Sequence, residues 1–157
     1  MILRSVSQRK AVLQRSKTIA MVGASANPLR PSYTVFSYLR TMTPFQTTPI
    51  NPAIAAIDGI KAYPSLAAYA QEHGAPDIVD VFRKPSEVAA VVREAITSGA
   101  KCVWFQYGVI NEDAIHLADE AGLDVVVDRC LKVENARLNG GLASGGLNSG
   151  LITSKRR

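Results

Sequence analysis

The segment KTIAMVGASANPLRPSYTVFSYL, residues Lys17–Leu39, decides the fold of this chain. An apolar run, Thr18–Val22, ends at Gly23, and a turn rich in Ser, Asn, Pro and Arg leads into helical spacing that begins at Pro31. This order of strand, glycine, turn and helix is typical of the phosphate-binding turns of α/β sheets, where free N–H groups at the helix start face an anion. The segment therefore predicts a strand and a helix joined by an anion site.

The same alternation of strand and helix continues along most of the chain. Short, almost continuously apolar runs are typical of strands buried on both faces of a parallel sheet. We expect such strands at 18–22, 77–82, 101–106 and 124–128, a further strand at 46–52, and a short extended piece at 60–63. Helical spacing, opened by Ser, Asn or Pro and often closed by Gly, predicts helices at 5–15, from 31 onward, and at 65–74, 85–99 and 111–122.

Strands that alternate with helices predict right-handed βαβ units. The expected fold class is α/β, a Rossmann-like, doubly wound and mostly parallel sheet with helices on both faces in three layers. We expect one domain over residues 1–137, with a leading helix in 1–15. The segment 138–157 is rich in Gly, Ser and Asn and ends in basic residues, so its composition predicts a tail that could join subunits of a homo-oligomer or bind a protein partner.

Composition excludes several classes of protein. The chain has 157 residues, of which 47% are hydrophobic and 20% charged, as in ordinary globular domains. Its apolar runs are too short to span a bilayer, so we expect no membrane partner. With only two cysteines and no secretory leader, a cytoplasmic location is expected. The net charge of +5 lies partly at the termini, without an RNA-binding aromatic signature or a recognition helix, so we expect no nucleic-acid partner.

The predicted ligand site is the edge where the parallel strands end. In open α/β sheets, ligands bind outside the carboxyl ends of the strands, near the point where the strand order reverses. Polar or conformationally special residues follow each expected strand, at 23–32, 51–52, 83–85, 106–108 and 128–130. Because parallel strands end at the same edge, these five loops are expected to form one site.

The first turn departs from the fingerprint of a nicotinamide dinucleotide site. The motif G-x-G-x-x-G would require glycines at the positions of Ser25 and Pro28. The second strand ends in Asn51 and Pro52, not near the acidic residue that binds a ribose diol. Classical NAD binding is therefore not expected, whereas a diphosphate remains compatible with the turn.

Several segments together resemble the small bacterial CoA-binding proteins, which are similar to the CoA-binding domain of the succinyl-CoA synthetase alpha subunit. Besides the opening stretch, they are TTPINP, YPSL, VDVFRKPSEV, AITSGAKCVWFQYGVINEDA and AGLDVVVDRC, in order from about residue 16 to 138. The sequence departs from that pattern at TMTPFQTTPI, where a glycine-aromatic turn would be expected. The resemblance implies a Rossmann-like fold that holds coenzyme A.

The resemblance also implies a set of cofactor-binding residues. The diphosphate would be surrounded by Gly23, Ala24, Ser25, Arg30, Pro31 and Ser32. Asn51 and Pro52 would line the adenosine side, while Phe82, Arg83 and Pro85 would form part of the adenine or pantetheine wall. Gln106 and Gly108 would lie toward the pantetheine arm. Coenzyme A carries a 3′-phosphate besides its diphosphate, so arginines near this edge are electrostatically suitable.

Few side chains in the sequence indicate chemistry of their own. His73 precedes a helix-ending glycine and His116 lies within a helix, so neither is expected to be catalytic, and no metal ligands occur at suitable spacing. Trp104 is expected in the core. Cys130 follows the last strand beside Arg129, whose charge could lower the thiol pKa and permit a mixed disulfide with CoA, although a packed, inert cysteine is the simpler interpretation.

The function we predict from the sequence is noncovalent binding of coenzyme A or an acyl-CoA, without a catalytic constellation. Two alternatives remain open. One is an enzyme or regulatory domain that binds another nucleotide, NADP or an adenylate, at the same edge. The other is a module that binds a protein partner through its tail.

Overall fold

The computed structural model describes residues 1–139. Its centre is a five-stranded, fully parallel sheet in the order β2-β1-β5-β6-β7. These strands are β1 (Thr18–Val22), β2 (Gln46–Ile50), β5 (Ile78–Val81), β6 (Cys102–Phe105) and β7 (Asp124–Val126). All five lie within the segments expected from apolar runs. The predicted Rossmann-like α/β class is confirmed.

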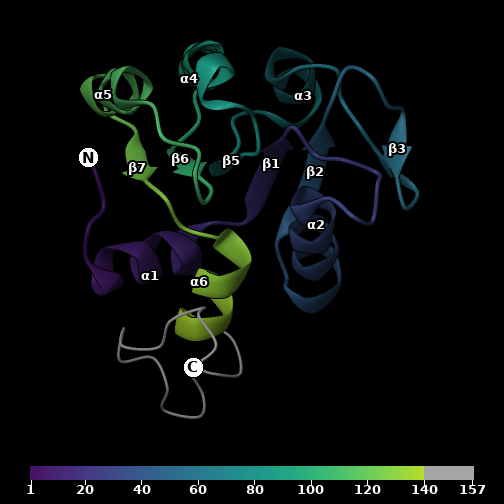
Figure 1. The fold of residues 1–157 in the computed structure, drawn as a ribbon, viewed down its shortest axis with the longest axis horizontal. Coiled ribbons are helices and arrows are strands. Elements are labelled where there is room, and N and C mark those ends of the chain that lie inside the picture. The colour runs from purple at the N-terminus through teal and green to yellow at the C-terminus, as the bar shows by residue number, and fades with distance from the viewer. Residues whose placement is uncertain (140–157) are drawn as a thin grey trace.

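Helices cover both faces of the sheet, which gives the predicted three layers (Figure 1). One layer holds α3 (Leu66–His73), α4 (Val88–Thr97) and α5 (Glu112–Glu120), and the other holds α1 (Val6–Arg15), α2 (Pro31–Met42) and α6 (Leu131–Leu138). A short 3₁₀ turn, η1 (Pro85–Glu87), precedes α4. Ser5, Ser65 and Asn111 cap α1, α3 and α5, because each side-chain oxygen accepts a first-turn backbone N–H.

Two apolar cores form, one on each face of the sheet. Along β5, Val79 and Val81 pack toward the α3–α5 layer, whereas Ile78 belongs to the core under α1, α2 and α6. This alternation follows from the two-residue repeat of a strand. Trp104 is fully buried in the second core, as expected, and its Nε1 donates to the Arg129 carbonyl at 2.8 Å.

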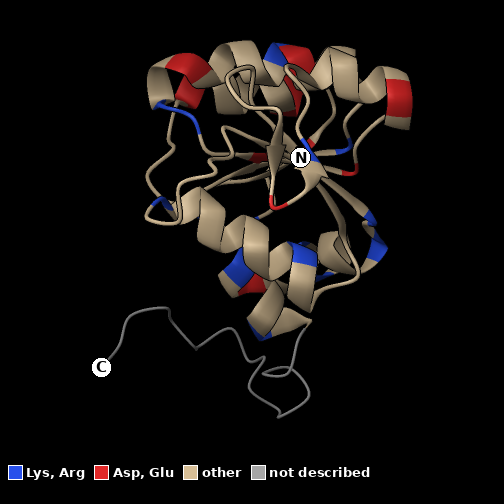
Figure 2. Ribbon diagram, turned by 90° about the vertical axis from the view of Figure 1, so that its right-hand side faces the viewer, with Lys and Arg blue, Asp and Glu red and all other residues tan. Residues whose placement is uncertain are grey.

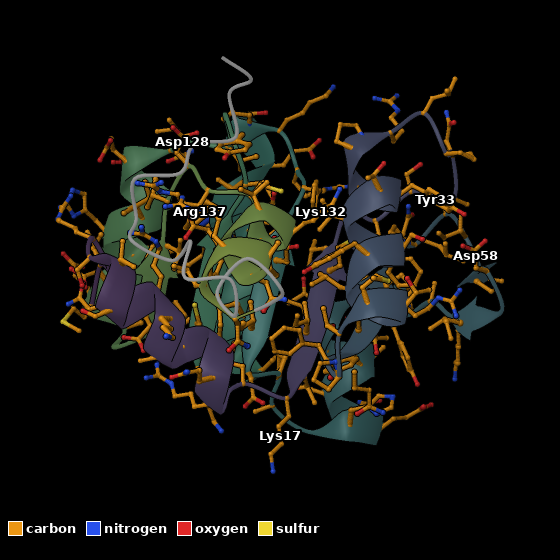
Figure 3. All side chains as sticks on the ribbon, turned by 90° about the horizontal axis from the view of Figure 1, so that it is seen from below. Lys17, Tyr33, Asp58, Asp128, Lys132 and Arg137 are labelled. Atoms are coloured by element: carbon orange, nitrogen blue, oxygen red, sulfur yellow. The ribbon has the colours of Figure 1, made fainter. Side chains whose placement is uncertain are left out.

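A small hairpin follows β2. Strands β3 (Ala56–Ile57) and β4 (Ile60–Lys61) pair antiparallel, so the expected extended piece at 60–63 contributes one strand of a hairpin that the sequence did not reveal. The Tyr33 hydroxyl of α2 donates to Asp58 in the hairpin turn at 2.8 Å, and Figure 3 shows the two residues side by side at this edge of the molecule. The hairpin is thereby attached to α2.

Helix α6 was not predicted, because its buried face is polar. Glu134 is 1% exposed and accepts from Arg9 Nε of α1 and Arg137 Nη1 of α6, each at 3.3 Å. These ion pairs replace the apolar stripe by which an amphipathic helix is recognised. Leu138, assigned to the tail from composition, is the buried last residue of α6. The rest of the predicted tail, residues 140–157, lies outside the described residues.

Charge divides between the two helical layers. Helices α3, α4 and α5 carry mainly acidic side chains, whereas α1, α2 and α6 carry mainly basic ones (Figure 2). No helix within residues 1–139 has the length and apolarity needed to span a membrane.

Candidate functional site

The strand order reverses at β1, because β2 lies on one side of it and β5 on the other. The carboxyl ends of β1 and β5 are therefore neighbours at a topological switch point, where ligands of open α/β sheets bind. All five loops expected from the sequence follow strands of this one parallel sheet, so they lie along the same edge. The structure thus brings the predicted loops together.

Gly23 is the point where these loops come closest. Its φ is +86°, and a Cβ placed there would lie 2.4 Å from the Phe82 carbonyl oxygen and 2.9 Å from Arg83 Cδ. The Gly23 N–H donates to the Ile50 carbonyl at 3.1 Å, and the Phe82 N–H donates to Val22 at 2.8 Å. Only glycine fits this conformation and this close approach without distortion.

The turn after Gly23 is held in shape by its own side chains. The Ser25 N–H donates to Ser32 Oγ and the Asn27 N–H donates to Ser25 Oγ, both at 3.1 Å. Ser32 is buried, while Arg30 is exposed beside the start of α2 and makes no side-chain hydrogen bond within residues 1–139. The turn therefore has an ordered backbone and an available cation at a helix N-terminus, as an anion site requires.

Two of the predicted residues support this turn instead of facing a ligand with their side chains. Ala24 is fully buried in the core, so only its backbone remains for other contacts. Asn51 Nδ2 donates to the Ala24 carbonyl, and Asn51 Oδ1 accepts from the Ala53 N–H, both at 2.8 Å. The Asn51 amide thus ties the loop after β2 to the loop after β1.

A hollow of about 370 Å³ opens beside β2, and we call it the β2-side hollow. It is lined by Val22, Gly23, Ile50, Pro52, Pro64, Ser65, Arg83, Glu87, Ala90, Val91 and Glu94. Arg83 Nε pairs with Glu87 at 3.1 Å. Two carboxylates, Glu87 of η1 and Glu94 of α4, therefore line a predominantly apolar space.

A second hollow of about 470 Å³ opens on the other side of the Phe82–Arg83 segment, and we call it the β6-side hollow. It is lined by Pro31, Val35, Phe82, Arg83, Lys84, Gln106, Tyr107, Val109 and Cys130. Most of this lining is apolar. Arg83 contributes to both hollows, so the two spaces adjoin across one arginine.

The base of the β6-side hollow carries a buried polar pair. Gln106 is 4% exposed, and its Nε2 donates at 2.5 Å to Oδ1 of Asp80, which is 0% exposed. Burial raises the pKa of Asp80 to about 8, and the Gln106 hydrogen bond only partly opposes that rise. Asp80 was not predicted as a site residue, since in the sequence it is only a polar residue in an apolar strand.

Cys130 lies in the wall of the same hollow, at the start of α6. Of the two interpretations drawn from the sequence, the packed, inert cysteine agrees with the structure, and the lowered thiol pKa does not. Burial raises the pKa of the Cys130 thiol, and the Arg129 guanidinium pairs with Glu134 at 3.5 Å. This environment favours the neutral thiol of Cys130 over the thiolate.

Some of the predicted site residues line one of the two hollows, and others do not. Those that line a hollow are Gly23, Pro31, Pro52, Phe82, Arg83 and Gln106. Gly108 and Pro85 do not line either hollow. The Gly108 N–H donates to Asp128 Oδ1 at 2.9 Å, and the Pro85 carbonyl accepts from Asn111 Nδ2 at 2.8 Å. Both residues fix loops at the site edge.

Some lining residues were missed by reasoning from the sequence. Pro64 and Ser65 reach the β2-side hollow because the Tyr63 N–H donates to Pro49, which carries the chain back along β2. The sequence indicated that α3 starts at Ser65, but it did not indicate that this start lies beside β2. Val35 and Val109 were hidden among many other valines that serve the core.

The two histidines lie away from the ligand edge. His73 ends α3, stacks on Tyr69 and lies 2.9 Å from the Tyr63 hydroxyl. His116 is exposed within α5. Both histidines thus lie in the helices in which the sequence placed them.

Comparison with known proteins gives a consistent result. The family profile described as CoA binding domain matches residues 17–136. The uncharacterized protein YneT of Bacillus subtilis is 37% identical over 132 residues, which cover 84% of this chain and 95% of YneT. A hypothetical protein of Pyrococcus horikoshii has a solved structure with a TM-score of 0.80 and 38% identity, covering 86% of this chain and 92% of that one. A solved structure from Thermus thermophilus has a TM-score of 0.78 and 35% identity, and the match covers 86% of this chain and 99% of that one.

Proposed function

Because this chain belongs to the CoA binding domain family, we propose that it binds coenzyme A or an acyl-CoA noncovalently at the carboxyl edge of its sheet. The observation that carries the proposal is the pair of hollows that adjoin at Arg83, with the Gly23–Ser32 turn beside them. Coenzyme A has the same three parts in sequence: a nucleoside, a phosphate-rich centre and a long neutral arm.

The adenosine end fits the β2-side hollow. Its lining is largely apolar, and the Glu87 and Glu94 carboxylates would repel a phosphate but not a neutral base. Pro52, on the loop after β2, and Pro64, on the loop after β4, offer flat apolar surfaces to this hollow. The 3′-phosphate would therefore lie outside the hollow, toward the basic side chains of the neighbouring loops.

The diphosphate fits the turn between Gly23 and Ser32. The start of α2 supplies the positive end of a helix dipole, and Pro31 occupies a first-turn position where no N–H is needed. Arg30 and Lys84 are exposed cations on the two loops that flank this point. They would neutralise the phosphates without first losing an existing partner, since neither makes an ion pair within the described part of the chain.

The pantetheine arm fits the β6-side hollow. Phe82, Val35 and Val109 provide apolar contact for its methylene and methyl groups, and Gln106 provides a hydrogen-bonding group. An acyl group on the thiol would extend into the same space.

The free thiols of Cys102 and Cys130 agree with the cytoplasmic location expected for such a protein.

Calorimetry tests the proposal. CoA and acetyl-CoA are expected to bind with dissociation constants in the micromolar range, roughly −8 kcal/mol at 1 μM, and dephospho-CoA more weakly. Arg30→Ala is expected to weaken CoA binding about tenfold, which corresponds to roughly 1.4 kcal/mol for one charge-assisted contact. Arg40→Ala removes a cation from the other end of α2 and is the matched control, with an unchanged constant. Binding of NADP or ATP without CoA would reject the proposal and favour a different nucleotide.

A further inference from the structure

The β6-side hollow rests on a carboxyl group for which the described residues provide no counter-charge. Asp80 is completely buried in the middle of the sheet, and its Oδ2 has no hydrogen-bond partner within residues 1–139. Its Oδ1 accepts only from Gln106 Nε2. The ion pairs of the described chain join other residues, and none includes Asp80. A charged carboxylate in this position would be costly, so the uncharged acid is the favoured form.

The uncharged acid is compatible with the geometry of the pair. With its proton on Oδ2, Asp80 keeps Oδ1 as a carbonyl acceptor for the Gln106 Nε2–H. The other end of the Gln106 amide, Oε1, makes no hydrogen bond to the described residues, and Gln106 lines the hollow. That oxygen is then available to accept an N–H from a ligand.

Building on the proposed function, we propose that Asp80 is a positioning residue that acts as a neutral acid, orienting Gln106 so that the β6-side hollow accepts an amide-bearing chain. Phe82 and Val109 surround the amide with apolar atoms. The Gln106 oxygen would pair with an amide N–H of the pantetheine arm. An ionised Asp80 would place an uncompensated charge beneath the hollow, and an apolar arm that fills the hollow would exclude the water that could solvate this charge, so the arm favours the uncharged acid.

The proposal predicts a pH dependence of binding. Burial raises the pKa of Asp80 to about 8, so the acid loses its proton as the pH passes through that value. Cys102 of β6 and Cys130 at the start of α6 interact electrostatically with Asp80, and Arg83 and Lys84 are the cations that line the hollow. Burial raises the pKa of both thiols, so they stay neutral where Asp80 begins to titrate.

Two ligands separate this proposal from the proposed function. Acetyl-CoA carries the arm without a free thiol, and adenosine 3′,5′-bisphosphate carries the nucleotide end without the arm. If only the protonated form binds the arm, the dissociation constant of acetyl-CoA rises about tenfold between pH 7 and pH 9, because the competent fraction falls by that factor. The constant of the bisphosphate is expected to change less than about twofold over this range.

Single substitutions test whether Asp80 is the group that causes the pH dependence of acetyl-CoA binding. Asp80→Asn keeps the shape and removes the titration, so its acetyl-CoA constant is expected to stay level from pH 7 to pH 9. Asp113→Asn removes an exposed carboxylate at the start of α5 and is expected to retain the wild-type profile. Gln106→Met is expected to weaken the binding of acetyl-CoA at pH 7 and to leave the dissociation constant of the bisphosphate unchanged.

The outcomes are distinct. A level wild-type profile for acetyl-CoA overturns the role of Asp80 even if Asp80→Asn fails to fold, and so does a pH dependence that survives in Asp80→Asn. If both ligands bind in either case, the proposed function stands and only the positioning role is rejected. Failure of both ligands to bind at pH 7 rejects the two proposals together.

Discussion

Replacing Gly23 by alanine tests the close approach that organises the site. The φ of +86° costs an L-residue roughly 1–2 kcal/mol. The added Cβ would also lie 2.4 Å from the Phe82 carbonyl oxygen, which belongs to the backbone and can move only with its loop. Overpacking of this kind costs about 1–3 kcal/mol. The combined loss of unfolding free energy is therefore expected to be about 2–5 kcal/mol.

Gly59→Ala provides the matched control. Gly59 has a similar φ of +81° in the hairpin turn, but no atom lies within 4 Å of the added Cβ. The loss of unfolding free energy in Gly59→Ala should therefore be the cost of the backbone conformation alone, about 1–2 kcal/mol. Urea denaturation of both variants and the wild type measures the difference, provided that the m-values agree. Equal losses in the two variants would refute the argument that the Phe82 backbone requires glycine at position 23.

Two further predictions concern buried groups. Glu134→Gln leaves Arg9 and Arg137 buried without their shared carboxylate, so unfolding free energy measured in urea is expected to fall by about 3–5 kcal/mol. Cys130 is expected to react with a thiol reagent at pH 7 more slowly than free cysteine, since burial raises its pKa, and bound CoA should slow the reaction further.

Each of these predictions has an internal control. Glu120→Gln changes an exposed carboxylate on α5 and is expected to alter stability by less than about 0.5 kcal/mol, and an equal effect at position 134 would contradict the buried ion-pair argument. Cys130→Ser is expected to abolish the labelling of native protein, because Cys102 is fully buried. Labelling of Cys130 as fast as free cysteine would show that the thiol is not shielded.

The sequence predicted the regular elements well, because their signals are local. Apolar runs placed the five strands of the main sheet, and Ser5, Ser65 and Asn111 marked helix starts by capping. The alternation of the elements was enough for the fold class. Helix α6 was missed because Glu134 and Arg137 occupy its buried face and depend on Arg9, which lies far away in the chain.

By itself, the sequence determined which loops lie along the carboxyl edge of the sheet and that the first turn differs from a dinucleotide fingerprint. Only the tertiary structure decided which loop residues line a hollow, which ones support a neighbouring loop, and that Asp80 bonds to Gln106 without a counter-charge among the described residues. The physical reason is that capping and side-chain periodicity act over one or two helical turns. Cavities and burial depend on strand order, which joins β1 to β5 across a long stretch of intervening chain.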